Sequence, residues 1–193
     1  FIGITFWDFF NKCLIQSVKL IKANKPIVSK VYIPKFILIL VKIGVNGFKM
    51  FISLLIIVAM LAVWRVPITY NVIYIIPILM TLIVLVFGFS CYLLHYGVFV
   101  EDLSNVLNIA LRFLFYLTGI FWSIMDRLPA PYNSYIGRCN PIAFLLTSAR
   151  DCVIYGSTPH RKLLLLWFVI GLIISALGVR KIYKNENSYV KVI

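Results

Sequence analysis

Acidic side chains are scarce in this 193-residue sequence, with only six Asp and Glu against 19 Lys and Arg, and charged residues make up just 13% of it. A chain with so little charge and 62% hydrophobic residues lies outside the composition of water-soluble globular domains. No GxxxxGK[ST], HExxH or GxSxG motif occurs, which argues against a nucleotide-binding P-loop, a zinc protease and a serine hydrolase. We therefore expect no catalytic residues.

Cysteine and histidine are also few, at four and two residues. The cysteines form no CxxC pair and have no histidine at metal-ligand spacing, so no metal site is predicted. Cys13 and Cys91 fit a packing role. Cys139 and Cys152 share one segment, and a disulfide between them stays open. His95 and His160, far apart in sequence, are predicted to be packed or interfacial.

The net charge of +13 raises the question of nucleic acid, which we reject as a partner. The basic residues cluster between long apolar stretches, where the positive-inside rule of membrane proteins predicts them. The sequence therefore indicates an all-α integral membrane protein, forming a single transmembrane domain over residues 1–193.

Stretches of about 20 apolar residues are long enough to cross a bilayer. Spans are predicted at about 43–64, 72–100, 103–125 and 163–179, with a partial span at 1–18. Because the sequence opens on Phe1 within an apolar stretch, we expect it to be truncated at the N-terminus. Four spans separate the lysine-rich segment 19–35 from the basic tail 180–193. This even number places both on the same side of the membrane, and their lysines and arginines predict that this side is cytoplasmic, with loops 65–71 and 126–162 outside.

Residues 140–159 read as a short capped helix that is too short and too charged to cross. Asn140 suits an N-cap, Pro141 the first helical position and Gly156 the C′ position. Arg150 and Asp151 stand side by side within it. We predict an outer re-entrant or interfacial segment over 128–159, with a plain surface-loop helix as the alternative.

Segment 19–35 contains a predicted short helix from Pro26 to about Tyr32. Ile27, Val28 and Val31 recur at helical spacing, which favours a cytoplasmic helix docking in another protein's groove. A solvated loop that only obeys the positive-inside rule is the alternative.

Two further features stand out around the span 103–125. Glu101 and Asp102 precede it, where helix capping is a sufficient explanation for acidic residues. Arg112 lies within the span, where an unpaired charge is costly, so it should face a protein interior, a wet cavity or an interface. The surrounding aromatic residues fit either helix packing or the lining of a translocation path for sugar rings: Phe113, Phe115, Tyr116, Phe121 and Trp122.

The order of these features resembles the membrane subunit of type-2 ABC exporters, in the group that exports O-antigen, teichoic acid or capsule chains. The resemblance rests on GITFWDFF (3–10), NKPIVSKVYIPKFIL (24–38), VEDLSNVLNIALRFLFYLTGIFWSI (100–124), the Asn-Pro and Arg-Asp pairs within 128–156, and the short tail LGVRKIYKNENSYVKVI.

This resemblance implies a six-helix permease domain, of which the sequence holds part of helix two through helix six, with a short re-entrant helix pair before the last span. It implies a homodimer that works with separate ABC ATPase subunits, so ATP and Mg would be bound by that partner and this chain would need no cofactor. The substrate would be a lipid-linked glycan or polyol-phosphate polymer. The location would be the bacterial cytoplasmic membrane, among membrane lipids, with a cytoplasmic C-terminus.

The resemblance also implies roles for particular residues. They are, for coupling to the ATPase, Lys25, Ile27, Val28, Lys30, Val31, Tyr32 and Pro34; for the cytoplasmic entrance, Glu101 and Asp102; for the translocation path, Arg112, Phe113, Tyr116, Phe121 and Trp122; and for an outer gate, Asn140, Pro141, Phe144, Arg150 and Asp151.

The sequence departs from the family pattern at three positions. Phe36 stands where an acidic residue is frequent, Glu101 where arginine is frequent, and Gly119 where proline is common. Because the charge at Glu101 is reversed relative to the family, we assign no specific ligand contact to this residue. A type-2 permease for a small drug or lipid, and an ATP-independent flippase or transferase, are the alternative functions.

Overall fold

The computed structural model describes residues 1–28, 33–65, 69–121, 137–186 and 188–189. The helices, in chain order, are α1 (Ile2–Val18), α2 (Leu20–Ala23), α3 (Lys25–Val28), α4 (Lys35–Val63), the 3₁₀ helix η1 (Tyr70–Tyr74), α5 (Ile75–Phe99), α6 (Leu103–Leu117), α9 (Pro141–Val153) and α10 (Arg161–Lys184). No strand occurs in these ranges. The all-α class predicted from the sequence is confirmed.

Within the described residues, three helices are long and apolar enough to cross a membrane: α4, η1 continued by α5, and α10. Helix α6 is apolar but shorter. It ends at Leu117, earlier than the predicted span, because Gly119 has a φ of 63° and turns the backbone out of the helix. Helix α10 runs from Arg161 to Lys184, further than the apolar stretch 163–179, since its terminal basic residues extend the helix toward water.

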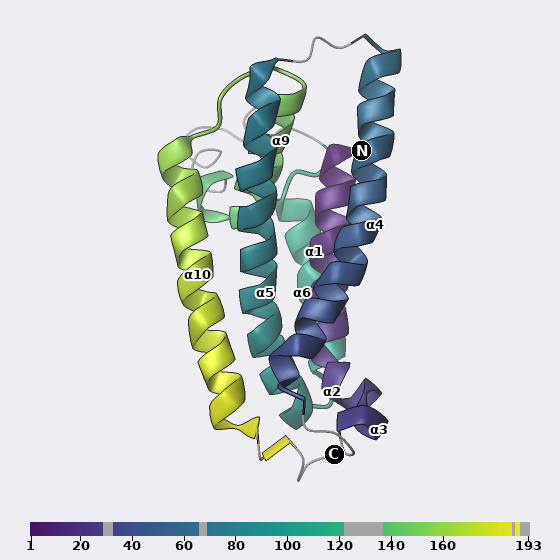
Figure 1. Cartoon of the computed structure of the whole chain (residues 1–193), viewed down its shortest axis with the longest axis vertical. Coiled ribbons are helices and arrows are strands. Elements are labelled where there is room, and N and C mark those ends of the chain that lie inside the picture. Colours follow the sequence, from purple (N-terminus) through teal and green to yellow (C-terminus); the bar gives the residue numbers. More distant parts are fainter. Residues whose placement is uncertain (29–32, 66–68, 122–136, 187, 190–193) are drawn as a thin grey trace.

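The long helices run side by side, and the short elements gather at the two ends of the bundle (Figure 1). Helices α2 and α3 lie at one end together with the C-terminus. Helix α9 lies towards the opposite end, near the connection from α4 to α5. The lysine-rich segment and the basic tail therefore share one end, as an even number of crossings between them requires.

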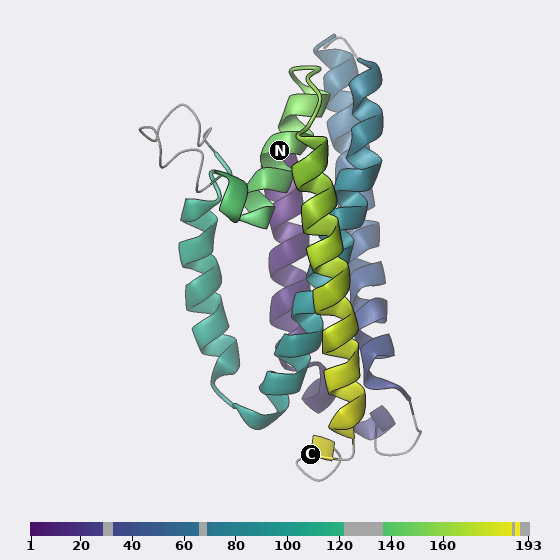
Figure 2. The ribbon, with the colours of Figure 1, turned by 90° about the vertical axis from the view of Figure 1, so that its left-hand side faces the viewer.

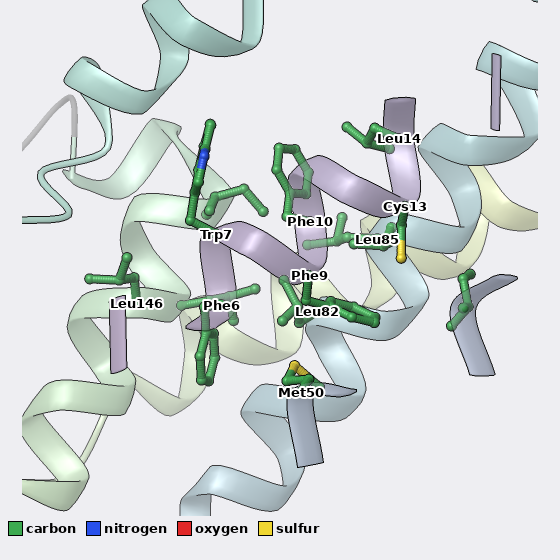
Figure 3. Packing of buried hydrophobic residues seen from close by; sticks show 14 of the residues in the cluster. Phe6, Trp7, Phe9, Phe10, Cys13, Leu14, Met50, Leu82, Leu85 and Leu146 are labelled. Atoms are coloured by element: carbon green, nitrogen blue, oxygen red, sulfur yellow. The ribbon is translucent and has the colours of Figure 1, made fainter. Parts of the chain in front are cut away.

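Helix α1 is the centre of the core although it is only 17 residues long. Phe6, Phe9, Phe10 and Cys13 are almost completely buried. Figure 3 shows them beside Met50 of α4, Leu82 and Leu85 of α5, and Leu146 of α9. A helix surrounded by helices on most sides must be apolar around most of its circumference, which explains the dense aromatic content of residues 1–18.

Small residues hold α5 and α10 together. A Cβ on Gly178 would come within 2.7 Å of the Cβ of Cys91, and one on Gly88 within 2.9 Å of Ile174. The Ser175 hydroxyl donates to the carbonyl of Val84 at 3.0 Å. Close backbone approach at small residues with an interhelical hydrogen bond is the usual packing of helices in membranes.

Helix α6 stands apart from the rest of the bundle (Figure 2). It leaves α5 at the end that carries the C-terminus and runs back towards α9, away from α10. Only Ser104 and Leu111 of its 15 residues are buried. Two hollows border α6, and together they form the candidate site.

Candidate functional site

A polar and aromatic groove lies between α1 and α6. Its volume is about 310 Å³, and its lining comprises Trp7, Asn11, Asn108, Leu111, Arg112, Phe115 and Tyr116. Arg112 is exposed along this groove, while Asn11 and Asn108 are half-buried. The guanidinium therefore lies at a polar hollow and not in a tightly packed interior, in agreement with the expected wet cavity or interface.

Aromatic rings connect the two walls of this groove. The Trp7 and Phe115 rings meet edge to face with centroids 5.5 Å apart, and Phe115 is 5.6 Å from Tyr116 and 5.7 Å from Phe121. Such edge contacts hold rings at defined angles. Tyr116 and Phe121 are more than two-thirds exposed, so their rings remain available to a ligand.

A larger apolar cavity lies on another side of α6, with a volume of about 930 Å³. Leu107, Ala110, Leu111, Leu114 and Leu117 of α6 form one wall. The remaining lining comes from α1, α5 and the start of α9: Phe10, Leu14, Phe89, Tyr92, Leu93, Tyr96, Cys139, Asn140, Pro141 and Ile142. Nearly every lining group is hydrocarbon or aromatic, so this cavity suits a hydrocarbon chain.

Asn140 joins the start of α9 to the end of α6. Its side-chain oxygen accepts hydrogen bonds from the backbone N–H groups of Ile142 (3.1 Å) and Ala143 (3.3 Å). Its amide nitrogen donates to the Thr118 hydroxyl at 3.2 Å. The predicted N-cap is confirmed, with Pro141 at the first helical position.

Arg150 makes the second connection between α9 and the segment after α6. Its guanidinium donates to the carbonyl oxygens of Gly119, at 3.1 Å, and Ile120. Gly3 of α1 packs against the same guanidinium, since a Cβ there would lie 2.7 Å from it. The positive φ of Gly119, at the carbonyl that accepts from Arg150, is inaccessible to proline.

Asp151 follows Arg150 but lies elsewhere on the helix, in a hollow lined by Arg138, Ser148 and His160 among others. Partial burial raises the pKa of the Asp151 carboxyl, and the neighbouring Arg150 charge opposes this rise. Phe144, on the same side of α9, is buried. Gly156 has a φ of 63° two residues beyond the C-cap Ile154, one position later than predicted.

Cys139 and Cys152 do not form a disulfide. All four cysteines are free, with Cys139 exposed and Cys152 fully buried on α9. No group of three His, Cys, Asp or Glu in the described ranges could hold a metal ion.

The two acidic residues before α6 are exposed. Asp102 is the N-cap residue of α6, but its carboxylate accepts from the Asn105 side chain at 3.5 Å and caps no backbone N–H. The cap is therefore weaker than the sequence suggested, although the charge still lies at the positive end of the helix dipole.

The coupling segment is described only in part. Helix α3 covers Lys25–Val28, the described part of the predicted helix, and Pro34 is the N-cap of α4. The Val28 side chain is only 7% exposed, so it packs within this chain and is not displayed to a partner as its place in the apolar face suggested. Lys30, Val31 and Tyr32 lie outside the described residues, as does Trp122, and nothing is described of the Ile27 side chain.

The structure brings together only part of the predicted translocation path. Arg112 and Tyr116 share the groove, whereas Phe113 is 69% exposed and does not line it. Sequence reasoning missed Trp7, Asn11 and Asn108 as groove residues. The polar residues Asn11 and Asn108 within apolar stretches were the sequence feature that could have indicated the groove.

Two curated proteins align with nearly the whole chain. Both are O-antigen export system permease protein RfbA from Klebsiella pneumoniae, and they are 23% and 22% identical over 192 residues, which is 99% of this chain and 73% of each relative. The chain is thus similar to O-antigen export permeases. No family model matches it. The resemblance noted from the sequence is thus confirmed, because the chain is similar to membrane permeases of polysaccharide export.

Proposed function

We propose that this chain is the permease subunit of an ABC exporter that moves a lipid-linked polysaccharide across the bacterial cytoplasmic membrane. The alignment with O-antigen export permeases over 99% of the chain carries this proposal. The groove supports it physically. The exposed ring of Tyr116 lies beside Asn11, Asn108 and Arg112, so the groove offers both a stacking surface and hydrogen bonds, which are the two contacts that sugar rings use.

The apolar cavity is the proposed place of the lipid part of the substrate. It adjoins the same helix α6 as the groove, and Leu111 lines both hollows. A glycan on one side of α6 and its hydrocarbon anchor on the other would each meet a wall of matching polarity. A small apolar drug would need the cavity alone, which makes the polysaccharide the better supported substrate.

The proposed assembly is a homodimer with two ATPase subunits. Arg112, Phe113 and Tyr116 are exposed on α6, and in a dimer they would face the partner copy or the path between the copies. The separate ATPase would bind ATP and Mg, and it would dock at the lysine-rich end of the permease. The C-terminus would be cytoplasmic. Helix α9 would form an outer gate with its copy.

Copurification tests this assembly. An affinity-tagged permease, expressed from its own operon, is expected to copurify with a P-loop ATPase and to stimulate export of a surface glycan. Deletion of the permease gene should leave lipid-linked glycan inside the cell. Absence of any ATPase, with lipid scrambling retained by the purified permease alone, would favour an ATP-independent flippase instead.

Arg112→Gln is expected to reduce glycan export about tenfold while leaving membrane abundance and thermal stability unchanged. The exposed guanidinium packs in no core, so its loss removes a ligand contact and not a structural one. Surface glycan per permease, measured by lectin binding, checks this. Lys49→Gln is the control, because Lys49 is also an exposed cation within a helix but lies on α4, away from the groove. Equal export by both variants contradicts the assignment of the path.

A further inference from the structure

Residues 185, 186, 188 and 189, which follow α10, pack against the lysine-rich end of the bundle. Lys35, the first residue of α4, forms an ion pair with Glu186, with 3.0 Å between Nζ and Oε1, and both side chains are buried. Tyr189 is completely buried, and its hydroxyl lies 2.8 Å from Nδ1 of His95 on α5. Its ring also meets that of Phe99.

The bend that returns this tail is itself held by hydrogen bonds. The Asn185 side chain donates to the carbonyl of Lys181 at 2.9 Å, and the Ser188 N–H donates to the carbonyl of Asn185 at 3.0 Å. Burial raises the pKa of Tyr189 to about 12, so its hydroxyl keeps its proton beside His95. The described residues of the tail are therefore held in place by specific contacts.

The lysine-rich segment is consequently attached to α5 at both of its ends. At its start, the backbone of Val18 packs directly against Gly97, and Leu20 and Ile21 are buried. At its end, Lys35 pairs with Glu186. Three residues after Glu186, the Tyr189 hydroxyl contacts His95 of α5. Pro34 and Lys35 are the last two residues of the segment that would meet the ATPase.

Helix α5 continues through Glu101 and Asp102 into α6, the separate helix that borders both hollows (Figure 2). A displacement of the lysine-rich segment can therefore reach α6 through groups attached to the end of α5, a second route beside the direct contact of α1 with α6. We propose that the tail residues Glu186 and Tyr189 are positioning residues that transmit movement of the coupling segment to α5 and α6. This inference rests on the proposed function and adds a mechanical role for the tail.

The test separates ATP hydrolysis from export in the assembled transporter. Lys35→Met, Glu186→Gln and Tyr189→Phe are introduced singly into the permease coexpressed with its ATPase, and both activities are measured in proteoliposomes. Each variant is expected to lower glycan export about tenfold, within the usual range of coupling between two sites, and to keep ATP hydrolysis within about twofold. The glycan exported per ATP should therefore fall.

Matched variants on the same tail serve as controls. Lys184→Met removes an exposed cation two residues before Glu186, and Tyr183→Phe removes a hydroxyl but keeps the ring contact with Phe36. Both should export normally. Lys35→Arg keeps the charge and should restore export relative to Lys35→Met, which a general packing defect would not allow.

The outcomes distinguish the two proposals. Unchanged glycan export per ATP in all three variants overturns the transmission role of the tail. A parallel loss of export, hydrolysis and thermal stability also overturns it, because the contacts would then be purely structural. No ATP-dependent export by the wild-type assembly overturns the proposed function instead.

Discussion

Gly97→Ala is expected to destabilise the protein by about 3 kcal/mol, the upper part of the range for overpacking. The glycine lies on α5 where a Cβ would overlap the backbone of Val18 at the end of α1. Backbone atoms cannot turn aside as a flexible side chain can, so α1 and α5 would have to separate. Thermal unfolding of the purified protein in detergent checks this.

Gly44→Ala is the control for this substitution. Gly44 lies on α4, and nothing lies within 4 Å of the position that its Cβ would occupy. Alanine is a better helix former than glycine by about 1 kcal/mol. The control should therefore be at least as stable as the wild type, and equal stability of the two variants would contradict the close contact of α1 with α5.

Arg150→Met is expected to detach α9 from the segment that follows α6. Methionine has similar length but leaves the carbonyls of Gly119 and Ile120 without their donors, at a cost of about 1–3 kcal/mol for each buried group left unpaired. The native thiol of Cys152, fully buried on α9, then becomes accessible. Maleimide labelling of Cys152 should be at least about tenfold faster, as a shift of 1.4 kcal/mol or more implies.

The experiment carries two internal references. Cys139 is already exposed and should label at the same rate in both proteins. Arg138→Met removes an exposed guanidinium near the start of α9 and should leave Cys152 protected. Slow labelling of Cys152 in Arg150→Met would show that Asn140 and the apolar face of α9 suffice to hold the helix.

Local features explain which sequence expectations were accurate. The N-cap at Asn140 depends on a hydrogen bond across two or three residues, so the sequence alone predicts it. The end of α6 was placed too late, because apolar residues continue past Leu117 while Gly119 turns the chain. The inward packing of Val28 was also missed, since helical spacing shows which residues share a face but not what covers that face.

The sequence by itself determined the membrane class, the approximate positions of the long helices and the relation to polysaccharide permeases. Each follows from hydropathy, charge placement or short motifs, which are properties of neighbouring residues. Only the tertiary structure decided that Trp7 and Asn11 share a groove with Arg112, that Arg150 holds the end of α6, and that Glu186 pairs with Lys35. These contacts join residues far apart in the chain, and they depend on how each helix is rotated about its axis, which no local pattern specifies.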